Sequence, residues 1–271
     1  MYNKIFPPKK IVLANGKVVV EKRSKTPLIL LIVMIAVYYA AQATGFSFEV
    51  IFKRIHEFFT IILQMLQPNW GYISGILPEL MVTLKMSFFG SVIGAIVALP
   101  AAVLASSNII KNRILDSILK TVLSLLRTMP TLVTALIATY VFDLPATAGT
   151  IAIFLFTISY VGKLLYEAIE NVDMGPFEAM ESTGMTRIQA FRYAIFPQIL
   201  PGYLSTSLFC FEGNVRYAAI LGYVGAGGIG NLINETIGWR DYSSLGMIVI
   251  MLVLTVYMIE TVSEHFRKKL I

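Results

Sequence analysis

Long apolar runs separated by short polar stretches make up most of the chain. A run of about 18 or more apolar residues is long enough to cross a bilayer as a helix. The pattern predicts about six such spans, which we place at 27–44, 77–105, 118–142, 147–165, 199–219 and 244–266. The expected fold class is therefore all-α, in a polytopic membrane protein.

The pattern also divides the chain into a cytoplasmic tail, a first transmembrane anchor helix, an extracytoplasmic amphipathic segment and a main transmembrane domain, at 1–26, 27–45, 46–76 and 77–271. In the tail, two short extended pieces flank Asn15-Gly16, which fits a small hairpin or an unstructured tail. Residues 50–66 place apolar side chains at helical spacing and charged ones between them. This spacing predicts an amphipathic helix on the outer membrane surface.

The distribution of charge predicts the orientation in the membrane. Only 14% of the residues are charged, against about 25% in a soluble domain. Seven basic residues precede the first span, and Arg267, Lys268 and Lys269 follow the last. Basic flanks mark the cytoplasmic side, so both termini are expected there. The excess of basic residues, a net charge of +6, is thus explained by the flanks of the membrane spans, and no nucleic-acid partner is expected.

Few residues suit a redox or metal site. The chain has one cysteine, Cys210, in an apolar run, so no disulfide is possible within it. His56 and His265 lie in polar flanks on opposite sides of the membrane, which argues against a shared metal site and an intramembrane enzyme. We expect no catalytic, cofactor-binding or metal-binding residues.

A polar island, Glu178–Pro201, separates two of the apolar runs. Pro176 suits the first turn of a helix, where its missing N–H costs nothing. Glu178 and Glu181 then lie near the positive end of that helix dipole. Gly184 ends the helix, because glycine tolerates a left-handed backbone.

A second short helix is expected directly after this turn. Thr186-x-x-Gln189 has the spacing of a capping box, in which each side chain bonds the other's backbone N–H. This helix leads into the span at 199–219. The polar island is therefore predicted to be a helix–turn–helix between two membrane spans.

A glycine-rich stretch follows the span at 199–219 and contains Gly225, Gly227, Gly228 and Gly230. It is too polar for a span and too apolar for a free loop. We expect a re-entrant or gate-lining segment, because irregular backbone in a membrane must lie against protein or water. No βαβ unit surrounds the glycines, which excludes a dinucleotide site.

The polar island resembles the EAA loop of ABC importer permeases. Glu178 and Ala179, Gly184 five positions after Ala179, and Pro197 match that pattern, whereas Met180 replaces its second alanine and Ala194 and Phe196 replace Ile and Leu. The stretch Glu212–Arg216 and the glycine-rich stretch resemble those of phosphonate importer permeases. The likeness extends from about residue 77 to the C-terminus.

This resemblance implies a type I, methionine-permease-like fold in a bacterial inner membrane. It further implies a homodimer, two cytoplasmic ABC ATPases that bind ATP and Mg, and an extracytoplasmic substrate-binding protein. Residues 173–192 would be the coupling loop that docks on the ATPase, with Glu178, Ala179, Glu181, Gly184, Thr186 and Pro197 as its residues. The chain has no Walker A pattern, G-x-x-x-x-G-K-[ST], so it is not the ATPase.

Polar residues within the spans are candidates for a path that carries an anion. Arg127 and Arg216 would lower the barrier to a phosphonate, with Asn214 as a neutral donor. Two structural alternatives stay open. Glu212 is four residues before Arg216 and can pair with it on one helix face, and Arg127 can instead bond carbonyls freed by Pro130.

Two other kinds of transporter fit parts of the pattern. One is an ABC permease for a different small solute such as methionine. The other is an ion-coupled secondary transporter, which would show paired broken helices and buried carboxylates in two repeated halves. The sequence shows no such internal repeat.

Overall fold

The computed structural model describes residues 10–12, 16–20 and 26–270. The chain divides into two compact units, one that reaches to Thr60 and one that begins at Ile61. In the first unit, strand β1 (Lys10–Val12) pairs antiparallel with β2 (Val18–Val20). Of the two alternatives for the tail, the strands support the hairpin; Asn15 of the expected turn lies outside the described residues.

Two helices follow the hairpin and differ in character. Helix α2 (Thr26–Thr44) is apolar on all sides and buries none of its residues. Helix α3 (Phe48–Met65) is amphipathic, and its polar face carries an ion pair of 2.6 Å between Lys53 and Glu49. The helix predicted over 50–66 is present, and its position on the outer membrane surface remains a prediction.

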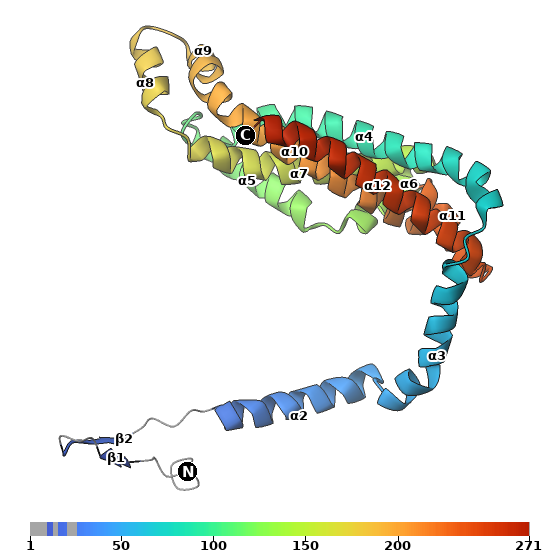
Figure 1. The fold of residues 1–271 in the computed structure, drawn as a ribbon. Coiled ribbons are helices and arrows are strands. Elements are labelled where there is room, and N and C mark those ends of the chain that lie inside the picture. Colours follow the sequence, from blue (N-terminus) through green and yellow to red (C-terminus); the bar gives the residue numbers. More distant parts are fainter. Residues whose placement is uncertain (1–9, 13–15, 21–25, 271) are drawn as a thin grey trace. The chain divides into compact units, whose positions relative to one another are not determined.

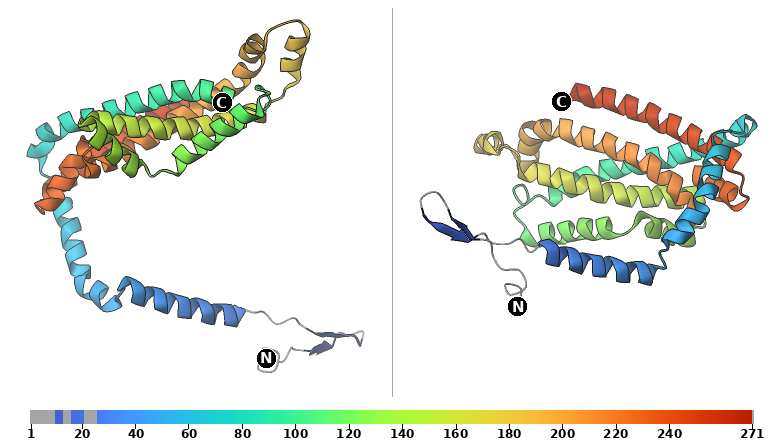
Figure 2. Two further views of the ribbon diagram at one scale, coloured as in Figure 1. Left: turned by 180° about the vertical axis from the view of Figure 1, so that it is seen from behind. Right: turned by 60° about the horizontal axis from the view of Figure 1, so that its bottom comes forward.

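The second unit is a bundle of long helices with short elements at its two ends. The long helices are α4 (Ile73–Leu104), α5 (Arg113–Thr128), α6 (Thr131–Phe142), α7 (Pro145–Glu170), α10 (Phe196–Leu221) and α12 (Tyr242–Leu270). The short elements are η1 (Trp70–Tyr72), α8 (Gly175–Ser182), α9 (Arg187–Ala190), the π-helical turn η2 (Phe191–Ile195), η3 (Gly222–Val224) and α11 (Ile229–Gly238). Helices α8 and α9 project from the end of the bundle where α12 ends, and α11 lies at the opposite end (Figure 1, Figure 2).

The helix count agrees with the predicted fold class. Within the described part of the chain, five helices are long and apolar enough to cross a membrane, and the bent pair α5–α6 makes a sixth. This supports the expected all-α membrane protein with about six spans.

The apolar run 118–142 had suggested one continuous helix for the third span. The structure shows two helices instead. Helices α5 and α6 meet at an angle of 92° across Met129 and Pro130. Met129 is extended, with ψ of 126°, because a proline disfavours the helical conformation of the residue before it. Pro130 also lacks the N–H that would continue the helix.

The loop between the predicted spans 77–105 and 118–142 is shorter than the 106–117 that those bounds imply. Helix α5 already begins at Arg113, since Asn112 caps it: its side-chain oxygen accepts hydrogen bonds from the N–H groups of Ile114 and Leu115. Asparagine is among the best residues at this position. Lys111 therefore stays in the loop, and Arg113 opens the helix.

Helix α7 is the centre of the bundle and packs against α4, α5, α6 and α10. Glycines in α4 allow its close contact with α7. A Cβ atom on Gly90 would lie 2.7 Å from Ile153, and one on Gly94 would lie 2.7 Å from Thr157. Small residues at helix contacts bring the backbones together, which is how membrane helices gain packing energy.

Replacement of Gly94 by leucine is expected to separate α4 from α7. Overpacking of this kind costs about 1–3 kcal/mol, so the free energy of unfolding in detergent, measured by SDS titration, should fall by that amount. Gly75→Leu in the same helix is the control, because no atom lies within 4 Å of a Cβ there. Equal stability of the two variants would contradict the assigned contact.

Candidate functional site

The α8–α9 segment, residues 173–192, begins with a short capped helix. Pro176 lies in the first turn of α8, as predicted, and the N–H of Gly175 donates to Oδ1 of Asp173 at 3.0 Å. Glu178 is in that first turn, where the helix dipole favours a negative charge. These local interactions stabilise the first turn of α8.

Gly184 ends α8 as the sequence predicted. It has φ of 89°, a left-handed conformation that glycine adopts at low cost. The N–H of Gly184 donates to the carbonyl of Glu181 at 3.0 Å, and that of Met185 to the carbonyl of Met180 at 3.3 Å. These two bonds form a Schellman motif, which satisfies the last carbonyls of the helix.

Thr186 starts α9 with the predicted capping box. Its hydroxyl accepts from the N–H of Gln189 at 3.4 Å, while the Gln189 side chain accepts from the N–H of Thr186 at 3.0 Å. Helix α9 then runs through η2 into α10, where Pro197 lies in the first turn. The polar island is therefore the expected helix–turn–helix.

Phe177 fixes α8 to the bundle. Only 2% of it is exposed, and it packs in one apolar cluster with Ala102 of α4, Ile169 of α7 and Ile195 of η2. Burial of such a side chain contributes about 1.5–3 kcal/mol. Phe177 was not among the residues predicted from the sequence, although its position directly after Pro176, in an otherwise polar stretch, was a usable signal.

The opposite side of the segment is exposed. Glu178 and Ala179 of α8 lie at the surface, and so do two apolar side chains near the turn, Met185 at 42% and Ile188 at 81% exposure. Exposed apolar side chains, methionine among them, are suited to contact with another protein.

Glu181 lies in the last turn of α8, so the expected position near the positive end of the dipole is wrong. It instead pairs across the turn with Arg187, whose Nε is 3.1 Å from its Oε1. Arg187 Nη1 also donates to the carbonyl of Ile109 at 2.6 Å. Arg187, which the sequence analysis did not single out, thus joins α8 and α9 to the loop between α4 and α5.

That loop is itself held to α7. The side-chain amide of Asn108 donates to the carbonyl of Ile169 at 2.7 Å, and Ser107 donates from its N–H and hydroxyl to Glu170 at 2.8 and 2.6 Å. Lys120 of α5 bonds the same carboxylate at 2.8 Å. The α8–α9 segment, the loop, the middle of α5 and the end of α7 are therefore connected by polar contacts.

The charged candidates within the spans lie in two places. Arg127 is exposed in the last turn of α5, just before the bend. Arg216 pairs with Glu212 on α10, as one alternative predicted, and 51% of its side chain stays exposed. The buried Glu212 carboxylate also lies 3.8 Å from Arg267 of α12, which the sequence analysis had treated only as a basic flank.

Asn214 is 1% exposed and lies between three helices. Its side-chain amide donates to the hydroxyls of Ser91 on α4 at 2.8 Å and Thr157 on α7 at 2.9 Å. A neutral donor on a solute path was expected here, but both donors are used in helix packing. Hydrogen bonds of this kind stabilise membrane helix contacts by about 0.6–2 kcal/mol.

The glycine-rich stretch is irregular over a shorter range than expected, since α11 begins at Ile229. Gly225, Gly227 and Gly228 all have positive φ. The N–H of Ile229 donates to the Thr83 hydroxyl of α4 at 2.8 Å. Gly222 and Gly230 lie so close that a Cβ on either would overlap the other's backbone, so this backbone is packed against protein.

Comparisons with known proteins extend these observations. Residues 90–270 match the family model described as binding-protein-dependent transport system inner membrane component. The chain is 30% identical to the phosphite transport system permease protein PtxC of Stutzerimonas stutzeri over 77% of this chain and 76% of that protein. It is 32% identical to the phosphate-import permease protein PhnE of Mycolicibacterium smegmatis over 78% of this chain and 40% of that protein.

Among solved structures, an inward-facing form of the MetNI methionine ABC transporter has a similar fold. The TM-score is 0.67 with 22% identity, and the match covers 75% of this chain and 99% of that one. The type I permease fold expected from the sequence is thereby confirmed.

Arg187→Gln is expected to loosen the α8–α9 segment without unfolding the bundle. A hydrogen bond from a charged donor contributes about 1.5 kcal/mol or more, so amide exchange in 106–112 and 183–190 should become roughly tenfold faster by mass spectrometry. Arg192→Gln is the control, because Arg192 lies exposed over the ring of Tyr193. Unchanged exchange in Arg187→Gln would refute its connecting role.

Proposed function

This chain belongs to the family of binding-protein-dependent transport system inner membrane components, and we propose that within this family it imports a phosphonate or phosphite anion. It is the permease subunit of an ABC transport system. The substrate proposal rests chiefly on the similarity to PtxC, a phosphite transport system permease, over three quarters of both chains. The name of PhnE, a phosphate-import permease, points to the same chemical class of phosphorus oxyanions.

The proposed complex holds two copies of this permease, two cytoplasmic ABC ATPases that bind ATP and Mg, and an extracytoplasmic binding protein. We assign the end of the bundle that carries α8–α9 and the C-terminal end of α12 to the cytoplasm. The basic residues Arg267, Lys268 and Lys269 support this orientation. Both termini would then be cytoplasmic, in a bacterial inner membrane.

Coupling follows from how the α8–α9 segment is attached. Its exposed Glu178 and Ala179 would contact the ATPase, together with Ile188. Phe177 and Arg187 hold the segment to α4, α7 and the loop after α4. When ATP closes the two ATPases, motion of α8–α9 would pass into these helices and open the permease outward. ATP binding does this work only if it favours one permease state over the other.

The solute path would lie between the two copies. Arg216, with half its side chain exposed, and Arg127 at the bend would lower the barrier to an anion. Glu212 would set the position of Arg216, and Asn214 would fix α10 against α4 and α7. Gly225, Gly227, Gly228 and Gly230 would shape the gate at the outer end.

A permease for another solute, such as methionine, is the second candidate, because the MetNI likeness speaks only for the fold. The ion-coupled secondary transporter that the spans also suggested is set aside by the family membership.

ATP hydrolysis by the reconstituted complex tests the substrate. The permease would be co-expressed with its neighbouring ATPase, placed in nanodiscs and supplied with the neighbouring binding protein, empty or loaded with methylphosphonate, phosphite, phosphate or methionine. We expect a phosphonate or phosphite to stimulate hydrolysis most. Stimulation by methionine alone would refute the anion assignment, and failure of an ATPase to co-purify would refute the assembly.

Gly184→Leu is expected to abolish stimulation while the protein still folds. A side chain in the left-handed conformation costs about 1–2 kcal/mol, so the turn between α8 and α9 should rearrange. Gly184→Asn is the matched control, because asparagine tolerates that conformation and a Cβ there meets no atom within 4 Å. Full transport-coupled hydrolysis by Gly184→Leu in the same nanodisc assay would contradict the coupling role.

A further inference from the structure

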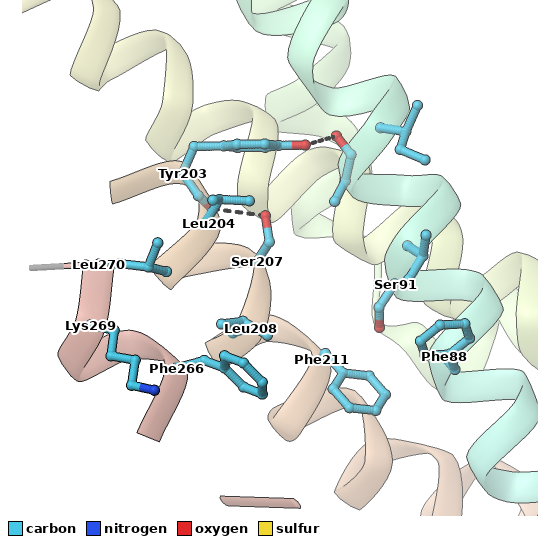
Figure 3. Close-up of a pocket in the computed structure, with 13 residues that line it drawn as sticks. Phe88, Ser91, Tyr203, Leu204, Ser207, Leu208, Phe211, Phe266, Lys269 and Leu270 are labelled. Atoms are coloured by element: carbon cyan, nitrogen blue, oxygen red, sulfur yellow. Dashed lines mark hydrogen bonds between the residues drawn. The ribbon is translucent and has the colours of Figure 1, made fainter. Parts of the chain in front are cut away.

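A cavity of about 590 Å³ lies between α4, α10 and α12. Helix α10 provides its floor, and α4 and α12 provide its two walls (Figure 3). Phe88 and Phe211 lie toward one end, and Tyr203 and Leu270 toward the other. All three helices are membrane-spanning candidates, so the space opens among groups that lipid surrounds.

The uncharged polar side chains in this cavity are already engaged in hydrogen bonds. The Tyr203 hydroxyl donates to the carbonyl of Ala95 at 2.9 Å, and the Ser207 hydroxyl donates to the carbonyl of Tyr203 at 2.8 Å. Ser91 accepts from the side-chain amide of Asn214 at 2.8 Å. A buried water needs several polar partners, so the lining favours a hydrocarbon occupant over water or a polar solute.

One charged group departs from this apolar lining. Lys269, in the last turn of α12, lines the cavity and has no ion-pair partner in the part of the chain that the structure describes. Its neighbour Lys268 is different, since it pairs with Glu264 at 2.7 Å and lines another surface. Among the described residues, the cavity thus combines an apolar groove with one cation that has no ion-pair partner, and that cation lies at the basic end of α12.

We propose that this cavity binds an acyl chain of an anionic phospholipid whose phosphate lies on Lys269. The groove matches the hydrocarbon, and the ammonium matches the phosphate. Basic pockets between membrane helices at the cytoplasmic side suit anionic headgroups. The bound lipid would fill the space between α12 and α4 and so join the last helix to the core of the bundle.

Native mass spectrometry of the purified permease complex, with phosphatidylglycerol and phosphatidylcholine added in turn, tests this site. Wild type should retain phosphatidylglycerol in preference. Lys269→Gln should weaken that retention roughly fivefold, the factor that one lysine near a membrane surface contributes, and leave phosphatidylcholine unchanged. Lys268→Gln should behave as wild type. Equal retention by Lys269→Gln and wild type would overturn the proposal.

A second pair of variants tests the groove itself. Val92 lines the cavity and Val97 does not, although both are 39% exposed on α4. Val92→Trp should fill the groove and abolish retention of both phospholipids at this site, whereas Val97→Trp should not. Retention by Val92→Trp at the wild-type level would overturn the proposal.

Brominated phospholipids identify the occupant of the groove. A bimane label can be attached selectively to Val92→Cys, because the native Cys210 is buried and protected from the reagent. Quenching by brominated acyl chains is expected. If the label is instead shielded from them, the groove is covered by protein, such as a second copy of this chain, and the lipid assignment is wrong.

Discussion

The close approach of α4 and α7 is the contact on which the bundle depends. In a bilayer, lipid tails are as apolar as leucine, so helices associate through packing and hydrogen bonds rather than through a hydrophobic driving force. Gly90 and Gly94 remove the side chains that would hold the two backbones apart. Asn214 then joins α10 to both helices through Ser91 and Thr157. The three helices form a core to which the remaining elements attach.

The two ends of this core are attached by different chemistry. At one end, an aromatic side chain, Phe177, and a charged one, Arg187, hold the α8–α9 segment. At the other end, the backbone of the glycine-rich stretch packs directly on Thr83 and on itself at Gly222 and Gly230. The α8–α9 segment is thus held through side chains, and the glycine-rich stretch is held through its backbone.

Local signals made the fold and the α8–α9 hairpin predictable. Hydrophobic run length gives the spans, and Pro176, Gly184 and Thr186 act on their own neighbours in sequence, so their roles can be read from spacing. Contacts across the fold were not predictable in this way. Arg187 meets Ile109 and Arg267 lies near Glu212 only because the helices bring distant residues together. The bend at Pro130 was missed because hydropathy does not register backbone direction, although the proline itself was visible.

The π-helical turn at Phe191–Ile195 has a consequence for how this chain is related to others. One residue added to a helix advances the following residues by about 100° around its axis, and π-helical turns are commonly such single-residue expansions. The wider π-helical turn can accommodate such an extra residue locally, so that α10 still presents Ile199, Cys210 and Asn214 to the core. A relative that is one residue shorter here could keep the same face of α10 inward with an ordinary α-helical turn in its place. The length of the chain can therefore vary at this point without a change in the helix contacts that follow.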